Sequence, residues 1–290
     1  MSGLRYVYAV CHPLEAPLQV QLTGVAGAPA KPLHHHGLVA VVSEVPERDF
    51  SEEPLRAHLE DLDWLAATAR AHQGVVDALT VVTTPLPLRL ATVFRDDSGV
   101  RSMIEAREDH FRATLDRLEG RVEWGVKVYV EPEQSLSAAQ SAAQPAPKAA
   151  SGREYLRQRR QQTRASEDMW RKAETFAARL HEELAAFAED SRLHAPQNPA
   201  LSGVEGRNVL NASYLVTRHD SEEFVELVDR VKDDVPGVRV ELTGPWAAYS
   251  FTGETPEEPG APGVPGEPEE RGGREALREP GKPGEPGERA

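Results

Sequence analysis

The sequence predicts an α+β protein with two domains that each combine a sheet with helices. Segments with the short alternating or continuously apolar patterns of strands are interleaved with longer segments whose apolar residues recur every three or four positions. Two stretches rich in small residues, proline or glycine divide the chain and end it. Hydrophobic residues make up 39% and charged residues 28% of the 290 residues, which is typical of a soluble globular protein.

The first domain is predicted over residues 1–131. Residues 4–10 alternate in the manner of a half-buried strand, and residues 38–42 form a continuous apolar strand. From residue 51 the pattern changes to an amphipathic helix that continues to residue 79, with Pro54 in its first turn. The remaining elements are predicted as strands over 80–83 and 88–94, a helix over 98–118 and a strand over 121–130.

A linker over residues 132–150 precedes the second domain, which is predicted over 151–252. The linker has too little apolar surface to offset the entropy of ordering. Ser151 stands three residues before Glu154, and this capping-box spacing predicts the start of a long helix. The other elements are predicted as a strand over 209–217, a helix over 221–232 and a strand over 238–242.

The long helix has two unlike halves. An apolar stripe runs through residues 169–187, so this half is expected to pack on the sheet. Residues 158–164 have almost no apolar side chains, and the basic patch over 153–160 is interpreted as a solvated, projecting face. The segment 253–290 is rich in proline, glycine and glutamate and is predicted to be an extended, disordered acidic tail.

Composition excludes several classes of protein. The net charge of −14 argues against nucleic acid as a partner, because phosphate binding needs a positive surface. No stretch approaches the ~18 apolar residues of a membrane-spanning helix, and no charged segment followed by an apolar one opens the chain. The single cysteine, Cys11, excludes an internal disulfide and fits a reducing compartment. We therefore expect a cytoplasmic protein.

No enzyme motif is found: the chain has no Gly-x-Gly-x-x-Gly, Walker or Gly-x-Ser-x-Gly sequence. The run His34–His36 suggests a metal site, but adjacent histidines on a strand point to opposite faces and no carboxylate is near in sequence. A solvated connection is the preferred interpretation. For Cys11, next to His12, a buried inert thiol is expected rather than a nucleophile. We predict no catalytic residue, no metal and no cofactor.

Two strings of residues stand out instead. PLPLRLATVF, at residues 85–94, cannot be a central strand because proline donates no hydrogen bond to a neighbouring strand, so an edge or a bend is expected. Its Arg89 is predicted either to form a structural ion pair between the domains or to meet a partner's acidic or backbone group. GPWAAYSF, at residues 244–251, carries Trp246 and Tyr249, which either close the core or anchor another protein.

Together with LRYVYAV at 4–10, GVKV at 125–128, GREYL at 152–156 and LNASYLV at 210–216, these strings resemble the GvpF/GvpL family of gas vesicle accessory proteins. The resemblance covers residues 4–252 and implies two α+β domains, the second ferredoxin-like. The chain departs from the usual family form at Ala247 and Ala248, where prolines are more usual. It also departs at Leu90 and Ala91, where Phe-Gly is more usual.

The resemblance implies a non-enzymatic, chaperone-like assembly protein that binds the small hydrophobic main shell subunit of the gas vesicle and other accessory proteins. The edge-type strings and the projecting half-helix are consistent with it, because exposed edges pair with strands of a partner. The candidate partner-binding residues are Arg89, Phe94, Trp246 and Tyr249. Two alternatives stay open: a minor structural component of the vesicle shell, and a regulatory module that senses a small molecule.

Overall fold

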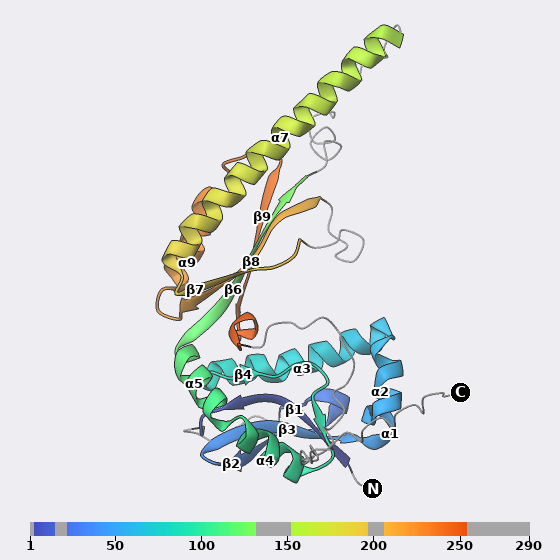
Figure 1. Cartoon of the computed structure of the whole chain (residues 1–290), viewed down its shortest axis with the longest axis vertical. Coiled ribbons are helices and arrows are strands. Elements are labelled where there is room, and N and C mark those ends of the chain that lie inside the picture. Colours follow the sequence, from blue (N-terminus) through green and yellow to red (C-terminus); the bar gives the residue numbers. More distant parts are fainter. Residues whose placement is uncertain (1–2, 15–21, 132–151, 197–205, 254–290) are drawn as a thin grey trace, which may run out of the picture. The chain divides into compact units, whose positions relative to one another are not determined.

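The computed structural model describes residues 3–14, 22–131, 152–196 and 206–253. It shows an α+β fold with two antiparallel sheets, which confirms the predicted fold class (Figure 1). By their contacts, residues 1–253 cluster into one compact unit. The linker predicted over 132–150 and nearly all of the predicted disordered tail lie outside the described residues.

The first sheet has the strand order β2-β3-β1-β4, with β5 also paired to β1. Its strands are β1 (Gly3–Cys11), β2 (Lys31–His35), β3 (Leu38–Pro46), β4 (Leu86–Pro87) and β5 (Val93–Phe94). The accompanying helices are η1 (Val25–Gly27), α1 (Glu47–Phe50), α2 (Glu52–Leu59), α3 (Leu62–Val82), α4 (Asp97–Ala106) and α5 (Glu108–Leu118). Helices cover both faces of this sheet, which explains the continuous apolar run of β3.

Alternate strand residues belong to different clusters. Val7 of β1 and Val42 of β3 pack with Val100, Ile104 and Phe111 of α4 and α5. On the opposite face, a second cluster joins the strands to α1 and α3, and its large members are Tyr6, Tyr8, Val39, Val41, Phe50, Val75, Val76 and Leu79. The first sheet is therefore the middle of three layers.

Several predicted element boundaries in this part were wrong. The helix expected over 51–79 is two helices, because Asp61 accepts hydrogen bonds from the backbone N–H groups of Asp63 and Trp64 and begins α3 anew. The strand expected over 80–83 is the last turn of α3, where Thr83 N donates to Leu79 O at 2.9 Å. The β-branched residues there favour strands, but helix propagation prevails.

Two further predictions for this part need correction. The helix expected over 98–118 is divided at Arg107, whose φ of −129° is not helical. In place of the single strand expected over 88–94, the structure has two short strands, Leu86–Pro87 and Val93–Phe94. They are separate because the chain turns at Ala91, whose φ is 64°. As predicted from its prolines, this string lies at an edge of the sheet.

The second sheet has the strand order β7-β8-β6-β9. Its elements are β6 (Arg121–Val130), α7 (Gly152–Phe187), β7 (Asp190–Leu193), β8 (Arg207–Thr217), α9 (Ser221–Val231) and β9 (Val238–Trp246), followed by η2 (Tyr249–Phe251). The order β-α-β-β-α-β with antiparallel pairing is the ferredoxin-like arrangement that the family resemblance implied. The segment 210–216 lies on an interior strand, as expected.

The strand over 121–130 was assigned to the first domain, and this assignment was wrong. It pairs with β8 and β9 and is an interior strand of the second sheet. Sequence order placed it with the elements before the linker, whereas hydrogen bonds join it to elements that follow. Division into two domains remains a prediction, and its boundary would lie near Glu119–Gly120 rather than at 131.

One face of the second sheet is covered by α7 and α9. Trp124, Val126 and Val128 of β6 pack there with Leu180 and Leu184 of α7. Helix α7 runs along the sheet and continues past it (Figure 1). The side chains described over 153–165 are all exposed, which agrees with the predicted solvated half.

Candidate partner-binding surface

The two strings singled out in the sequence contribute to the same two core clusters. Leu86 and Leu88 from the first string share a cluster with Ala248 and Phe251 from the second. In the other cluster, Ala247 is a buried member, and Val93 and Tyr249 pack against it. The tertiary fold thus brings together segments that are separated by about half the chain.

Within the first string, burial separates the structural residues from the accessible one. Leu86, Pro87 and Leu88 are buried, and Leu88 N donates to Tyr8 O at 2.9 Å. Phe94 is half-buried against the core. Arg89 is exposed, so it is not a buried cation, and its backbone carbonyl accepts a hydrogen bond from Thr92 Oγ1 at 2.7 Å.

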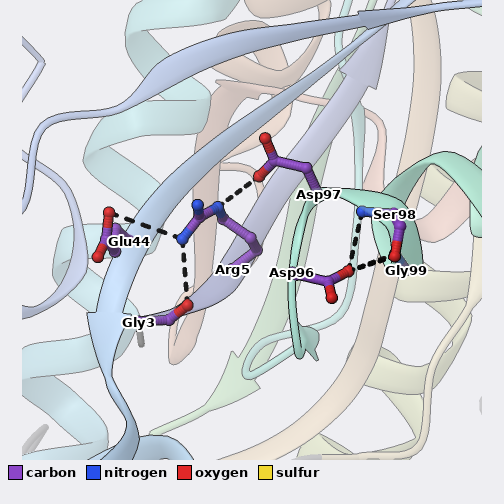
Figure 2. A network of polar contacts seen from close by, with 7 residues as sticks. All are labelled: Gly3, Arg5, Glu44, Asp96, Asp97, Ser98 and Gly99. Carbon is purple, nitrogen blue, oxygen red and sulfur yellow. Dashed lines mark hydrogen bonds and ion pairs between the residues drawn. The ribbon is translucent and has the colours of Figure 1, made fainter. Parts of the chain in front are cut away.

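Two residues after Phe94, a group of polar contacts marks the start of α4 (Figure 2). Asp96 accepts hydrogen bonds from Ser98 N at 2.9 Å and Gly99 N at 3.0 Å and so caps the helix. The Ser98 hydroxyl also donates to Asp96, and this bond is the largest cause of a lowered pKa of the Asp96 carboxyl, followed by the bond from the Gly99 N–H group. A Cβ on Gly99 would lie 3.4 Å from Phe94, an ordinary van der Waals distance, so the helix starts beside this side chain.

A second group of contacts joins α4 to the sheet through Arg5 of β1. Its guanidinium Nε lies 2.5 Å from Asp97 Oδ1, and Nη1 lies 3.6 Å from Glu44 Oε2 of β3. Nη1 also donates to Gly3 O at 3.1 Å. Three elements therefore converge on one arginine (Figure 2).

The second string ends strand β9, which is an outer strand of its sheet. Gly244 has a φ of 128°, and a Cβ there would come within 2.8 Å of Glu123 O, so only glycine fits this position. The next residue but one, Trp246, keeps 39% of its surface exposed. Trp246 is therefore an accessible aromatic side chain at the end of an edge strand.

Tyr249 is placed differently from Trp246. Its ring packs against the cluster on the α3 side of the first sheet, and its hydroxyl is buried. Burial raises the pKa of this hydroxyl above its usual value. Of the two interpretations considered for this string, core closure fits Tyr249, and only Trp246 retains an accessible ring.

A buried carboxylate that the sequence analysis missed holds η2. Glu123 of β6 is 7% exposed and accepts hydrogen bonds from Ser250 N at 2.8 Å and Ser250 Oγ at 2.7 Å. Ser250 Oγ also lies 3.2 Å from Ser213 Oγ, which is 2.9 Å from His194 Nε2. No local pattern could have revealed this cluster, since its members come from β6, β8, η2 and the residue that follows β7.

Two open cavities are relevant to a small-molecule ligand. One of about 820 Å³ is lined by residues of α7 and the loop before β9, among them Arg171, Phe176 and Asp234. Another of about 480 Å³ is lined by residues that include Arg5 and Asp97, which already satisfy each other. The second cavity therefore has two of its charged groups already paired with each other.

Two other observations bear on predictions made from the sequence. Cys11 is fully buried, and burial raises the pKa of its thiol to about 12, which agrees with the expected inert thiol. Among the described residues, no helix is both long and apolar enough to cross a membrane.

Comparison with known proteins now identifies the family. The model for the family described as gas vesicle synthesis protein GvpL/GvpF matches residues 4–253. Gas vesicle protein L from Streptomyces sp. (strain CB03234) is 56% identical over 252 residues, covering 86% of this chain and 93% of the relative. Gas vesicle protein F of the same strain is 26% identical over 255 residues, covering 85% and 98%.

The solved structures agree with the sequence relatives. The crystal structure of gas vesicle protein GvpF from Anabaena sp. PCC7120 matches with a TM-score of 0.62 at 19% identity, over 89% of this chain and 99% of that one. GvpF from Microcystis aeruginosa matches with a TM-score of 0.60, also at 19% identity, over 87% and 99%. The chain belongs to the gas vesicle synthesis protein GvpL/GvpF family.

Proposed function

We propose that this protein is a non-enzymatic assembly factor that binds the hydrophobic main shell subunit of the gas vesicle and keeps it from aggregating before it is added to the shell. Family membership supplies the biological context. The observation that carries the proposal is the outer strand β9, which ends at the exposed ring of Trp246. An outer strand offers backbone groups to an incoming strand, and a partly exposed tryptophan next to it is a common anchor.

Burial reduces the set of candidate contact residues to two. Tyr249 and Phe94 pack against the core clusters, so we assign them to holding the surface in shape. Trp246 and Arg89 are the exposed members, and we assign partner contact to them.

The exposed half of α7 supports a second contact, with other accessory proteins of the vesicle. Leu156 is 57% exposed there and stands among arginines, including Arg159, Arg160 and Arg164. A cationic helix face with an apolar side chain suits an acidic protein surface.

We further propose that the protein is L-type and acts in the cytoplasm at the growing vesicle. The support for the type is a comparison within one organism: identity is 56% with protein L and 26% with protein F of the same Streptomyces strain.

The test is co-expression with the main shell subunit, followed by size-exclusion chromatography of the soluble fraction. We expect the subunit to co-elute with the wild-type chain. Trp246→Ala should weaken the complex about thirtyfold, as for a hot spot of about 2 kcal/mol. Leu193→Ala is the matched control, because Leu193 is 64% exposed on the opposite outer strand β7.

Three outcomes would change the proposal. If the subunit aggregates whether or not this chain is present, the chaperone-like role is wrong. Equal losses in Trp246→Ala and Leu193→Ala would remove β9 as the contact. If the chain instead stays with purified, washed vesicles, a structural component of the shell becomes the better explanation.

A further inference from the structure

The turn between β2 and β3 brings two adjacent histidines to the same side. Strand β2 ends at His35 and β3 begins at Leu38, so His36 and Gly37 form a two-residue turn. Both turn residues have positive φ values, 48° and 69°, as tight hairpins require. The imidazole rings of His35 and His36 consequently stack with centroids 4.4 Å apart. The expectation that neighbouring histidines here point to opposite faces was therefore wrong for this pair, because His36 lies beyond the strand.

Two glutamates from the helices meet these rings. Glu105, near the end of α4, places Oε1 2.6 Å from His35 Nε2. Glu108, the first residue of α5, places Oε2 2.6 Å from His36 Nδ1. The helix break at Arg107 presents both carboxylates to the hairpin. The sequence near the histidines contains no carboxylate, but the fold brings Glu105 and Glu108 to them from about 70 residues away.

The turn is held in place by a residue outside this group. Arg112 of α5 donates from Nε to Glu108 Oε1 at 2.9 Å and from Nη2 to the backbone carbonyl of His36. The pKa of the Glu108 carboxyl is lowered, first by its hydrogen bond to the His36 ring and then by its bond to Arg112. The hairpin and α5 are therefore connected before any ligand is considered.

We propose that His35, His36 and Glu105 form a binding site for a divalent transition metal ion of the zinc type, a site that is independent of the shell-binding function. One ligand atom from each of the three lies within 4.8 Å of the others. Tetrahedral zinc holds nitrogen and oxygen ligands at about 2.0–2.1 Å, which separates them by about 3.3 Å. Rotation of the side chains can bring the ligand atoms from within 4.8 Å to this separation, because these groups are partly exposed. Water would complete the coordination.

The donor types determine the class of metal. Two imidazoles with one carboxylate suit zinc, cobalt, nickel or copper, whereas magnesium and calcium prefer sites made of oxygen atoms. Glu108 is a positioning residue: its bond to His36 Nδ1 leaves Nε2 of that ring for the metal. The bound ion would fasten the β2–β3 turn to α4.

The experiment is a calorimetric titration of the full chain, purified without a polyhistidine tag, with zinc chloride, repeated with cobalt chloride by visible absorption. We expect one equivalent to bind. His35→Ala, His36→Ala and Glu105→Ala should each weaken binding at least tenfold, and Glu108→Gln about tenfold. Zinc should also raise the melting temperature of the wild type but not of His35→Ala.

His34→Ala is the matched control. His34 belongs to the same run of histidines and is exposed. It lines the cavity that contains Arg5 and is not a member of the group formed by His35, His36 and Glu105. Its loss should leave zinc affinity unchanged. If His34→Ala weakens binding as much as His35→Ala, the histidine run binds metal without a defined site and the proposal fails.

Absence of binding at millimolar zinc would also overturn the proposal and leave two histidine–glutamate ion pairs as the role of these residues. Circular dichroism of each variant without metal checks that it is folded. Should an alanine variant unfold, the double substitution His35→Gln with His36→Gln keeps the polar surface and gives the same test.

Discussion

Burial of one histidine makes stability depend on pH. His72 of α3 is 4% exposed, and its Nδ1 lies 3.0 Å from the Tyr6 hydroxyl. Burial lowers the pKa of His72 from 6.5 to about 4. The unfolded chain therefore takes up a proton at a higher pH than the folded one.

The sign of the effect follows from linkage: stability is fully present above pH 6.5 and is lost as the pH falls toward 4. The loss from this group amounts to about 3 kcal/mol. We expect His72→Gln to flatten the pH dependence of the free energy of unfolding, measured in urea between pH 7.5 and 4.5. His219→Gln, at an exposed position, should retain the wild-type slope. Superimposable profiles for His72→Gln and wild type would contradict this assignment.

The backbone at Ala91 is strained. The residue has a φ of 64°, in the left-handed region that favours glycine. Ala91→Gly should raise the free energy of unfolding by about 0.5–1 kcal/mol, because relief of strain exceeds the added entropy of the unfolded chain.

The matched control is the same substitution at Ala248, which is buried at a φ of −78°. Ala248→Gly should destabilise the protein, because glycine increases the conformational entropy of the unfolded chain and no backbone strain is relieved at this position. Chemical denaturation measures the free energy of unfolding of both variants. A loss of stability in Ala91→Gly would contradict the prediction that Ala91 is strained.

At the scale of elements, α7 divides into a half that packs and a half that does not. Leu180 is 2% exposed in the core of the second sheet, whereas Leu156 is 57% exposed. We expect Leu180→Ala to cost about 2–5 kcal/mol of stability through the cavity that it leaves. The identical substitution at Leu156 should change stability by less than about 0.5 kcal/mol. Urea denaturation midpoints measure both, and a large loss at Leu156 would mean that this half of the helix is packed.

At the scale of the whole molecule, η2 links the two sheets. Phe251 is 1% exposed and belongs to the cluster of α4 and α5, which also contains Leu215 of β8. Arg117 of α5 donates to the Phe251 carbonyl, and Ser250 is bound by Glu123 of β6. Residues from both sheets therefore share one core through this short segment.

Phe251→Ala should accordingly cost about 3–5 kcal/mol. Because the core is shared, we expect the loss to appear in both sheets, measured residue by residue as amide hydrogen exchange in β1 and in β8. Faster exchange in β1 alone would show that the sheets unfold independently, as two separate domains. Leu193→Ala, at an exposed position on β7, is the comparison that should leave both sheets unchanged.

The amino-acid sequence was sufficient to predict the fold class, the family and those features that depend on local patterns. Prolines in 85–94 placed that string at an edge, and the apolar stripe over 169–187 identified the packed half of α7. These predictions succeeded because proline's missing donor and a helix's apolar face act within a few residues.

The pairing of the elements and the contacts between distant side chains became known from the three-dimensional fold alone. It placed β6 in the second sheet, separated exposed Trp246 from Tyr249 with its buried hydroxyl, and brought His35 and His36 to glutamates about 70 residues away. The physical reason is that strand pairing and burial depend on contacts between distant segments, about which a local pattern of apolar and polar residues carries no information.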